Sequence, residues 1–426
     1  MYCGGCLHGN TLVAALRHAG EDAMLLPVYT PLRTDEPSQA MPRVFFGGLN
    51  VYLQQKSALF RYMPGFVHRL LDHPALLRAA GRAAGSTRPE QLGALTVSML
   101  RGEPGSQGRE LDALLDWLAD FKPDVVHLFS VLLAGMARPI AARLGVPVVC
   151  TLAGEDLFLE QLPPPHYAQA RDALGERCAD LAALIAMNRY FADFMADYLP
   201  VPRSRIHVIP PGLNLDGHAR PGDLIARADD PRRTRTIGYL ARIAPEKGLH
   251  LLAAAFARLA TDPQLPPLRL RAAGYLAAAD RPYLAEIQRK LAAAGLAGRF
   301  EYTGAPDRAD KIALLQSFDV MGLPTVYRES KGLSVVEAWA NGVPVVVPRH
   351  GAFPEMLADT GGGLLCAPND PASLAAALAE LLRDPARAVS CGRQAQRAVH
   401  DRYNAEQMAQ QTIAVYKAVV RRTAEG

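Results

Sequence analysis

The sequence predicts an α/β protein of two domains. A chain of 426 residues is too long for one ordinary hydrophobic core and has about the right length for two. Short apolar runs of strand length alternate with helical segments along the chain, as in parallel sheets whose faces are covered by helices. Residues 214–233 are polar and carry Pro and Gly, so we interpret them as a hinge linker between residues 1–213 and residues 234–404.

Composition and charge exclude several classes of protein. Half of the residues are apolar and 21% are charged, as in an ordinary globular enzyme. The net charge of +4 is too small to argue for a nucleic-acid partner. No apolar stretch has the length of a membrane span, and the first residues lack the basic and apolar parts of a signal peptide. We therefore expect a cytoplasmic protein.

The six cysteines do not predict a disulfide framework, because only Cys3 and Cys6 are close together. A redox pair would need a preceding strand, and a zinc site would need a second pair at ligand spacing. We interpret residues 3–6 as a glycine-rich turn that leads into a helix over residues 10–19, and we expect no metal there.

In the first half, apolar runs predict strands and periodic segments predict helices. The expected strands cover residues 22–29, 123–129, 146–152 and 181–187. The expected helices cover residues 10–19, 111–121, 132–144, 167–178 and 190–199. A further apolar run occupies residues 43–56, and residues 57–101 have helical character with arginines between the apolar side chains.

Two interpretations of that arginine-containing region remain open. Residues 57–85 form either a basic amphipathic surface that touches anionic lipid, or an ordinary helical insertion packed on the first domain. The first interpretation predicts a peripheral protein at the inner face of the cytoplasmic membrane.

In the second half the same alternation continues. The expected strands cover residues 268–274, 318–323 and 343–348. Another strand opens the domain at Arg235 and runs into a loop, residues 300–304 form a strand and turn, and residues 361–370 close the sheet. The expected helices cover residues 249–259, 283–295, 311–317, 333–340, 371–384, 386–402 and 405–421, and another helix starts at Glu355.

The segment from Phe318 to Glu355 is the part of the chain that points to a ligand. A short buried strand, a loop and a helix follow one another, so the helix begins at the carboxyl end of a parallel strand, where open α/β sheets bind ligands. The amides of the first helical residues would face an anion, with the helix dipole behind them. These amides belong to Gly332, Leu333 and Ser334.

Two carboxylates flank this turn, Glu329 before the helix and Glu337 inside it. Carboxylates accept hydrogen bonds from paired sugar hydroxyls. A phosphate flanked by sugars fits this arrangement, and a nucleotide sugar is such a ligand. The alternative is that both are solvated acids, one of them favoured by the helix dipole.

Two cations occupy a second strand-to-helix crossover, Arg242 and Lys247. Arg offers a bidentate fork and Lys a mobile point charge, which is what a diphosphate site requires. No Asp-x-Asp pair stands beside these motifs, so we expect the cations to take the place of a divalent metal.

The motifs resemble a known family. Glu329 and Glu337 have the E-x₇-E spacing within the segment P-T-V-Y-R-E-S-K-G-L-S-V-V-E-A-W-A-N-G-V-P-V-V, and Arg242 and Lys247 match its G-R-x₄-K-G element, with Gly238 in the strand. This pattern resembles the retaining glycosyltransferases of family four, the glycosyl transferases group 1, which have the GT-B fold. The resemblance implies two Rossmann-like, doubly wound domains that face each other across a cleft, with the last helix crossing back onto the first domain.

The resemblance also implies roles in the second domain. Glu337 would hold the ribose of the nucleotide, and Glu329 would face the donor sugar and its leaving phosphate. Arg242 and Lys247 would neutralise the departing diphosphate, and the turn at Gly304 would lie where relatives contact the base. The nucleotide sugar is a substrate, so no cofactor is expected.

In the first domain the resemblance is less complete. Gly4 and Gly5 resemble the family's glycine-rich loop, but the strand that precedes this loop in the family is missing here, and residues 405–426 would complete the domain. Relatives carry a histidine where this chain has Ala153, so Glu155 or Asp156 would supply its contact, or else cap the next helix. His127 resembles another recurring family position, with a structural role as the alternative.

The family implies transfer of a sugar to a glycan, a lipid-linked or a small-molecule acceptor, with retention of anomeric configuration. Two other classes stay open. One is a phosphorylase or epimerase of the same fold, and the other is a nucleotide-sugar-binding protein without turnover.

Overall fold

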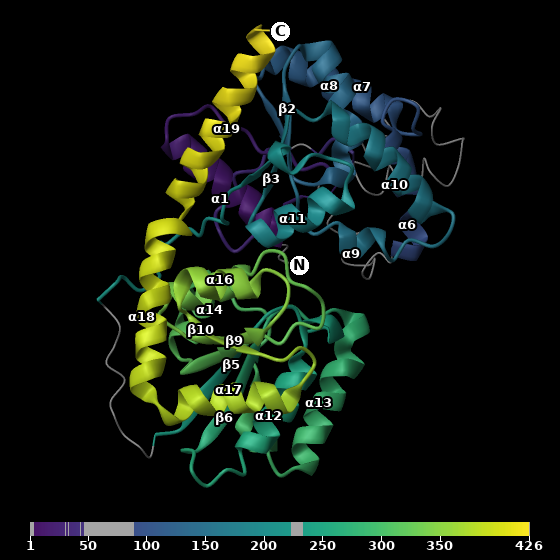
Figure 1. Ribbon diagram of the computed structural model, residues 1–426. Helices are drawn as coiled ribbons and strands as arrows, with labels where there is room; N and C mark the ends of the chain where they lie inside the picture. Colours follow the sequence, from purple (N-terminus) through teal and green to yellow (C-terminus); the bar gives the residue numbers. More distant parts are fainter. Residues whose placement is uncertain are drawn as a thin grey trace. The chain divides into compact units, whose positions relative to one another are not determined.

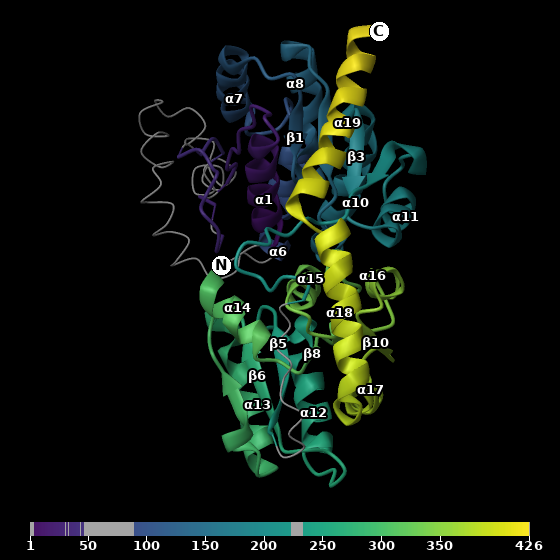
Figure 2. The same cartoon turned by 90° about the vertical axis from the view of Figure 1, so that its left-hand side faces the viewer.

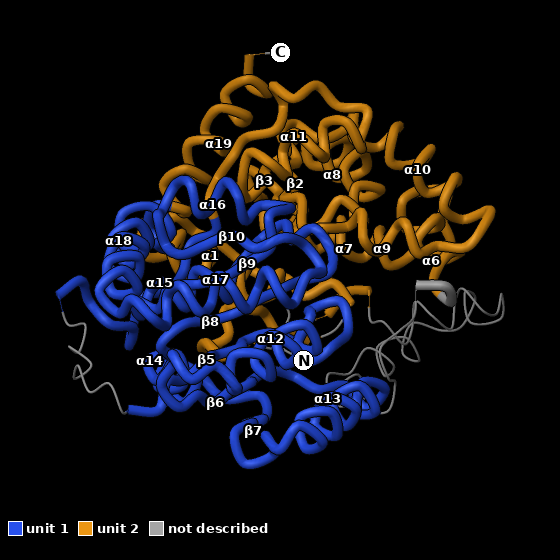
Figure 3. Tube along the Cα trace, turned by 60° about the horizontal axis from the view of Figure 1, so that its bottom comes forward, with its two compact units in different colours: residues 1–2, 211–407 blue, residues 3–210, 408–426 orange. Residues whose placement is uncertain are grey.

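The computed structural model describes residues 4–29, 31–32, 34–42, 44–46, 89–222 and 233–425. The chain forms two compact units. The N-terminal unit contains residues 3–210 and 408–426, and the C-terminal unit contains residues 1–2 and 211–407 (Figure 3). The last helix, α19 (Ala405–Glu425), therefore lies for most of its length in the unit that the beginning of the chain forms, as predicted.

The N-terminal unit has a parallel sheet with strand order β1-β2-β3-β4. The strands are β1 (Val126–Leu128), β2 (Val148–Thr151), β3 (Ala183–Ala186) and β4 (Ile206–Val208). The helices are α1 (Gly4–His18), α6 (Pro89–Arg101), α7 (Gly108–Phe121), α8 (Ala137–Leu144), α9 (Asp156–Leu159), α10 (His166–Arg177) and α11 (Arg189–Tyr198), and the 3₁₀ segment η1 is Val131–Met136.

Both faces of this sheet are covered. Successive side chains along a strand point alternately into one hydrophobic core and the other. Val149 and Ile185 pack in one core with residues of α1 and α19, whereas Val148 and Leu184 pack in the other core. Helices α1 and α19, at the two ends of the sequence, lie side by side on this sheet (Figures 1 and 2). The near-continuous apolar character of the strands follows from burial on both faces.

The C-terminal unit has a six-stranded parallel sheet with order β10-β9-β8-β5-β6-β7. The strands are β5 (Arg235–Leu240), β6 (Leu268–Ala273), β7 (Phe300–Tyr302), β8 (Val320–Gly322), β9 (Val345–Pro348) and β10 (Gly363–Cys366). The helices are α12 (Leu249–Leu259), α13 (Arg281–Ala293), α14 (Arg308–Gln316), α15 (Leu333–Ala340), α16 (Phe353–Thr360), α17 (Pro371–Arg383) and α18 (Pro385–Arg402).

The order of these six strands is that of a doubly wound Rossmann sheet. Chain order runs outward from β5 to β7 on one side and from β8 to β10 on the other, so the direction reverses between β5 and β8. The predicted fold class of two parallel-sheet, Rossmann-like domains is confirmed.

Two predictions in the first 30 residues are wrong. Residues 22–29 do not form a strand but only a single parallel bridge between Leu25 and Ala40, because Pro27 has no amide hydrogen to extend a ladder. The glycine-rich turn before residue 10 is instead the start of α1, which begins at Gly4. Its buried face contributes more than the low helix propensity of glycine costs.

Several predicted features lie outside the described residues. These are the apolar run beyond Phe46, the proposed membrane contact at residues 57–85, Cys3, and most of the second half of the linker. Residues 214–222 of the linker are described, and they belong to the C-terminal unit, where Gln396 Nε2 donates to Ala219 O over 3.0 Å. None of the helices in the part of the chain that the structure describes could cross a membrane.

Candidate active site

The reversal point between β5 and β8 brings two predicted motifs together. The loop after β5 carries Arg242 and Lys247, and the loop after β8 carries Glu329. Val326 N donates to Glu246 O over 2.9 Å, which joins the two loops. Gly248 has a φ of +77°, and a Cβ at this position would lie 1.8 Å from Pro324 O. Only glycine therefore allows this close approach.

Lys247 and Tyr327, both half-buried, form one cluster with the buried Glu329 at this point. Lys247 Nζ lies 2.9 Å from Glu329 Oε2, and it also donates to the hydroxyl of Tyr327. The Tyr327 hydroxyl donates to the same carboxylate oxygen over 2.7 Å. The Lys331 amide donates to the other oxygen, Oε1, over 3.2 Å. The predicted proximity of Lys247 and Glu329 is present, whereas Tyr327 is a partner that the sequence reasoning missed.

The charge of Glu329 is fixed by this cluster. Burial opposes ionisation, but the Lys247 ammonium and the hydrogen bonds from Lys247, Tyr327 and the Lys331 amide together lower the pKa of Glu329 to about 2. Burial and the neighbouring carboxylate raise the pKa of Tyr327 far above its usual value. At neutral pH the acid of this cluster is therefore charged and its tyrosine is neutral.

Arg242 lies at the exposed margin of the cluster. Its guanidinium pairs with Glu246, four residues later in the same loop region, and its side chain is 39% exposed. The Tyr239 hydroxyl donates to the carbonyls of both Arg242 and Lys247, over 3.3 Å each, and so fixes the loop that carries the two cations. The positive charge of Arg242 also reaches Tyr327, whose pKa it lowers against the larger effect of burial.

Helix α15 begins beside Glu329 with its amides uncapped. Gly332 is its N-cap with a φ of +66°, and the amides of Val335 and Val336 donate to Gly332 O. No side chain among the described residues caps this end. The amides of Gly332, Leu333 and Ser334 therefore form the first turn, as predicted.

The loop after β9 holds the backbone of Glu329 in place. Ala352 N donates to Glu329 O over 2.8 Å, and His350 Nε2 donates to Thr325 O over 3.0 Å. Gly351 has a φ of +62°, and a Cβ there would lie 2.5 Å from Glu329 O. The sequence reasoning missed these residues, although the position of this loop at the carboxyl end of the adjacent strand was a usable signal.

Glu337 is buried in α15 and is paired with a residue that the sequence reasoning did not consider. Lys311 of α14 forms an ion pair with Glu337 Oε1, and both side chains are buried. Asn341 Nδ2 donates to Glu337 O over 2.9 Å and also contacts His218 Nδ1 at 2.9 Å.

The two other predicted donor-site glycines have different surroundings. A Cβ on Gly238 would lie 2.0 Å from the Phe318 ring, so this glycine makes room for a core side chain within β5. Gly304 has a φ of +80° with open space around its Cα, and its carbonyl accepts a hydrogen bond from Gly274 N over 2.8 Å. Gly304 thus lies in an accessible turn after β7, where a base contact was predicted.

In the N-terminal unit, His127 in the middle of β1 contacts neighbouring side chains through both ring nitrogens. Nδ1 lies 2.6 Å from the Tyr416 hydroxyl, Nε2 lies 2.8 Å from Thr151 Oγ1, and the ring stacks on Phe129 at 4.7 Å. Burial, with a smaller effect of His8, lowers the pKa of His127 to about 3. His127 is therefore neutral, and its contacts join the last helix to the sheet.

The two acids after β2 differ. Glu155 accepts from Val131 N over 3.0 Å and from Ala153 N over 2.7 Å, so its carboxylate joins the loops after β1 and β2 and does not cap α9. Asp156 is buried, and its Oδ1 accepts no hydrogen bond from any described residue. Burial, assisted by the charges of Glu155 and Glu160, raises the pKa of Asp156 to about 6.

The remaining sequence candidates have simple placements. Gly4 and Gly5 lie in the first turn of α1, not in a loop. Among the described residues, no group of three or more His, Cys, Asp or Glu side chains could hold a metal ion.

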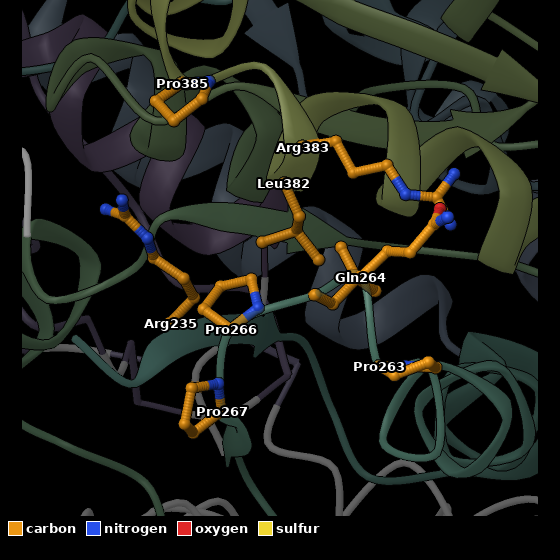
Figure 4. A pocket seen from close by; sticks show the side chains of 9 residues that line it. Arg235, Pro263, Gln264, Pro266, Pro267, Leu382, Arg383 and Pro385 are labelled. Atoms are coloured by element: carbon orange, nitrogen blue, oxygen red, sulfur yellow. The ribbon is translucent and has the colours of Figure 1, made fainter. Parts of the chain in front are cut away.

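A cavity of about 520 Å³ lies at the opposite edge of the C-terminal sheet, where β5 and β6 begin (Figure 4). Prolines dominate its wall, together with the aliphatic part of Leu382. Arg235 and Arg383 at its margin pair with Asp319 and Asp262, respectively. Nothing at this cavity resembles the charged cluster at the carboxyl edge.

Comparisons with known proteins agree with this geometry. The model of the family "Glycosyl transferases group 1" matches residues 225–398, and that of "Glycosyltransferase Family 4" matches residues 46–216. The 2-deoxystreptamine glucosyltransferase of Streptomyces kanamyceticus is 30% identical over 71% of this chain and 79% of its own length. The chain belongs to glycosyltransferase family 4. Its predicted activity, glycosyl transfer, is confirmed.

Other relatives and solved structures fit the assignment. The D-inositol 3-phosphate glycosyltransferase of Segniliparus rotundus is 29% identical over 78% of this chain and 72% of its own length. Sucrose-phosphate synthase from Thermosynechococcus elongatus has a similar structure, with a TM-score of 0.69 and 18% identity over 97% of each chain. An Anabaena protein, HepE, in complex with UDP has a TM-score of 0.62 at 17% identity, over 93% of this chain and 100% of its own. These structural likenesses show the GT-B fold of this glycosyltransferase.

Proposed function

We propose that this glycosyltransferase transfers a sugar from a nucleoside-diphosphate sugar to a hydroxyl-bearing acceptor, with retention of configuration and without a metal ion. The observation that carries the proposal is the partly buried Lys247–Tyr327–Glu329 cluster beside the uncapped start of α15. Lys247 and the amides at the start of α15 suit the anionic part of a ligand. Glu329 beside them suits a part of the same ligand that carries hydroxyls.

Each residue has a part in the proposed reaction. Lys247, Arg242 and the amides of Gly332–Ser334 take up the negative charge that develops on the diphosphate. When the donor binds, Lys247 contacts the phosphate in place of Glu329. Glu329 then accepts hydrogen bonds from hydroxyls of the donor sugar. Glu337 accepts hydrogen bonds from the ribose.

The proton and electron balance needs no enzymic base. The bond from the anomeric carbon to the phosphate oxygen breaks, the bond to the acceptor oxygen forms on the same face, and the acceptor proton passes to the leaving phosphate oxygen. Glu329, with a pKa of about 2, is too weak a base to take that proton. The cations that stabilise the diphosphate therefore carry the catalytic effect.

The acceptor is proposed to bind the N-terminal unit. Relatives are named for transfer to inositol 3-phosphate and 2-deoxystreptamine, both ring compounds with several hydrogen-bonding groups. Asp156 is a buried acid at the carboxyl edge of that sheet, and its Oδ1 has no hydrogen-bond partner among the described residues, so it suits a hydroxyl of such an acceptor. We also propose that the protein acts in the cytoplasm.

A donor panel tests the proposal. The protein is mixed with UDP-, GDP- and ADP-sugars in turn, and its melting temperature is measured; a donor at a hundredfold its Kd adds about 2.7 kcal/mol of stability. The donor that binds is then incubated with inositol phosphates and aminocyclitols in the presence of EDTA, and the anomeric configuration of the product is read by NMR.

We expect one donor class to bind, Glu337→Ala to lose that response, and the product to keep the donor's configuration. Binding without turnover of any donor would mean a nucleotide-sugar-binding protein. Dependence of turnover on a divalent metal would contradict the assigned role of Arg242 and Lys247.

A further inference from the structure

The C-terminal unit contains a buried ion pair whose lysine has no assigned role. Lys311 is 8% exposed and Glu337 is 6% exposed, and the ammonium contacts Glu337 Oε1. Burying two opposite charges costs desolvation energy, and an apolar pair of similar volume is often as stable or more stable. Stability alone is therefore a weak reason for this lysine.

Both partners of the pair are held by rigid elements. Lys311 lies on α14, whose first turn is capped by the Asp307 side chain through Asp310 N at 2.9 Å. Arg308 of the same helix donates to the carbonyls of Asn214 and Asp216, over 2.9 Å each. These contacts fix where the ammonium can reach. Glu337 lies in α15, and Asn341 at the end of that helix binds the Glu337 carbonyl.

The place of the pair in the fold connects two parts of the proposed donor site. Helix α14 follows the turn at Gly304 after β7, and α15 begins at the uncapped amides of Gly332–Ser334. The ion pair thus joins α14 to α15. Helix α14 follows the predicted base contact, and the start of α15 faces the predicted phosphate.

The chemistry of a carboxylate explains why a counter-charge matters here. An ionised carboxylate accepts two hydrogen bonds from neighbouring hydroxyls, whereas a neutral carboxyl group is itself a donor at one oxygen. A buried carboxylate without a nearby cation favours the neutral form. The Lys311 ammonium on Oε1 fixes the direction of the Glu337 carboxylate, whose oxygens can accept from a pair of hydroxyls.

We propose that Lys311 is a positioning residue that holds the Glu337 carboxylate oriented toward the 2′- and 3′-hydroxyls of the donor ribose. Lys311 thereby sets a preference for ribonucleotides over 2′-deoxyribonucleotides. This inference rests on the proposed donor role of the C-terminal unit. It assigns no contact between Lys311 and the nucleotide itself.

Calorimetric titration with paired nucleotides tests the inference. The probes are UDP, GDP and ADP, each beside its 2′-deoxy form, added to the full-length protein at pH 7.5. For the diphosphate that binds, we expect the 2′-deoxy form to bind about tenfold to a hundredfold more weakly, since it loses a hydrogen bond to a charged group.

Lys311→Met is the main variant. We expect it to weaken the ribonucleotide more than the 2′-deoxy form, which has only the 3′-hydroxyl to lose, until both forms bind within about threefold of each other. Lys311→Gln keeps a hydrogen-bond donor without the charge and serves as the second variant if Lys311→Met does not fold. Lys290→Met, on the exposed face of α13, is the matched control and should keep the wild-type ratio.

The double variant Lys311→Met/Glu337→Gln separates an indirect role from a direct one. If Lys311 acts through Glu337, the double variant has the same affinity ratio as Glu337→Gln alone. Loss of affinity for both sugar forms in equal proportion would mean that Lys311 contacts the nucleotide directly, which overturns the inference. An unchanged ratio in Lys311→Met overturns it as well.

The outcomes also distinguish this inference from the function on which it rests. A wild-type protein that binds none of the three diphosphates contradicts the donor role itself. A wild-type protein that binds one of them without regard to the 2′-hydroxyl leaves the donor role intact and removes the ribose role of the ion pair.

Discussion

Glu329 and Asp156 are two acids in equivalent places with opposite electrostatics. Each follows the carboxyl end of a strand in its own parallel sheet, and their exposed fractions are similar, 7% and 9%. The pKa of Glu329 lies at about 2, and that of Asp156 at about 6. Burial raises both, so the neighbours account for the difference.

The charged neighbours of Glu329 and Asp156 have opposite signs. Glu329 has the Lys247 ammonium and two further hydrogen-bond donors around it. Asp156 has two other acids, Glu155 and Glu160, and no cation among the causes that shift its pKa. Two acids with similar burial, one in each Rossmann-like unit, therefore have opposite electrostatic surroundings. The predictions below either remove this contrast or make it sharper.

The largest effect is expected from Lys247→Met, which makes the surroundings of Glu329 resemble those of Asp156. Loss of a preorganised charge at the diphosphate should lower kcat by about a hundredfold to a thousandfold. The unpaired Glu329 should also destabilise the C-terminal unit by up to about 3 kcal/mol. Steady-state kinetics with the donor and thermal unfolding measure the two effects.

A double variant separates activity from folding. Lys247→Met/Glu329→Gln removes both charges and should regain most of the stability without regaining activity, because the phosphate still lacks its cation. Lys290→Met is the exposed control and should behave as the wild type. Wild-type kcat in Lys247→Met would show that Arg242 and the helical amides suffice.

The next largest effect concerns the loop that holds Glu329 in place. In Gly351→Ala, the new Cβ would lie 2.5 Å from Glu329 O, so the Glu329 backbone must shift. We expect at least about a tenfold loss of kcat and a loss of roughly 1 to 2 kcal/mol from the left-handed conformation alone.

Gly295→Ala is the matched control for this substitution. Gly295 has a similar φ of +72°, but a Cβ there meets nothing within 4 Å. It should show the backbone cost without the loss of kcat. Equal kcat values in the two variants would mean that the loop after β9 does not position Glu329.

The sequence predicted the bounds of helices well where residues typical of helix ends mark them. Helices α12 and α15 have the predicted bounds, because glycine precedes each start, and in α15 Asn341-Gly342 marks the end. The two cations and Glu329 could be placed at one edge because parallel strands put their carboxyl ends together. The predicted strand at residues 22–29 is absent because Pro27 interrupts the backbone hydrogen bonds, although the segment is apolar.

The partners of the site residues could not be predicted in the same way. Lys311 is 26 residues from Glu337 and on another helix, and the Lys247–Tyr327 contact spans 80 residues. Such pairs depend on strand order and helix packing, which no local pattern specifies. The buried state of Asp156 has the same origin, since its pKa follows from tertiary burial more than from its immediate neighbours.

The smallest expected effect is a pH-dependent gain of stability in Asp156→Asn. The folded pKa of about 6 lies above the ordinary value of 3.8, so the folded state binds more protons than the unfolded state between these values. The stability that this group contributes is complete below about pH 4 and is lost as pH rises through 6. At pH 7 the variant should therefore be more stable than the wild type by about 1 kcal/mol, a value reduced for partial solvation.

Melting temperatures measured every half unit from pH 4 to pH 7.5 check this. The wild type and Asp156→Asn should agree near pH 4 and diverge above pH 5, with the variant higher by roughly 2 to 4 °C at pH 7. His127 has a pKa lowered to about 3 and destabilises both proteins equally on acidification, so it cancels in the difference. A difference that does not depend on pH would show that Asp156 is ionised throughout, and the contrast with Glu329 would then lie only in the partners of the two acids.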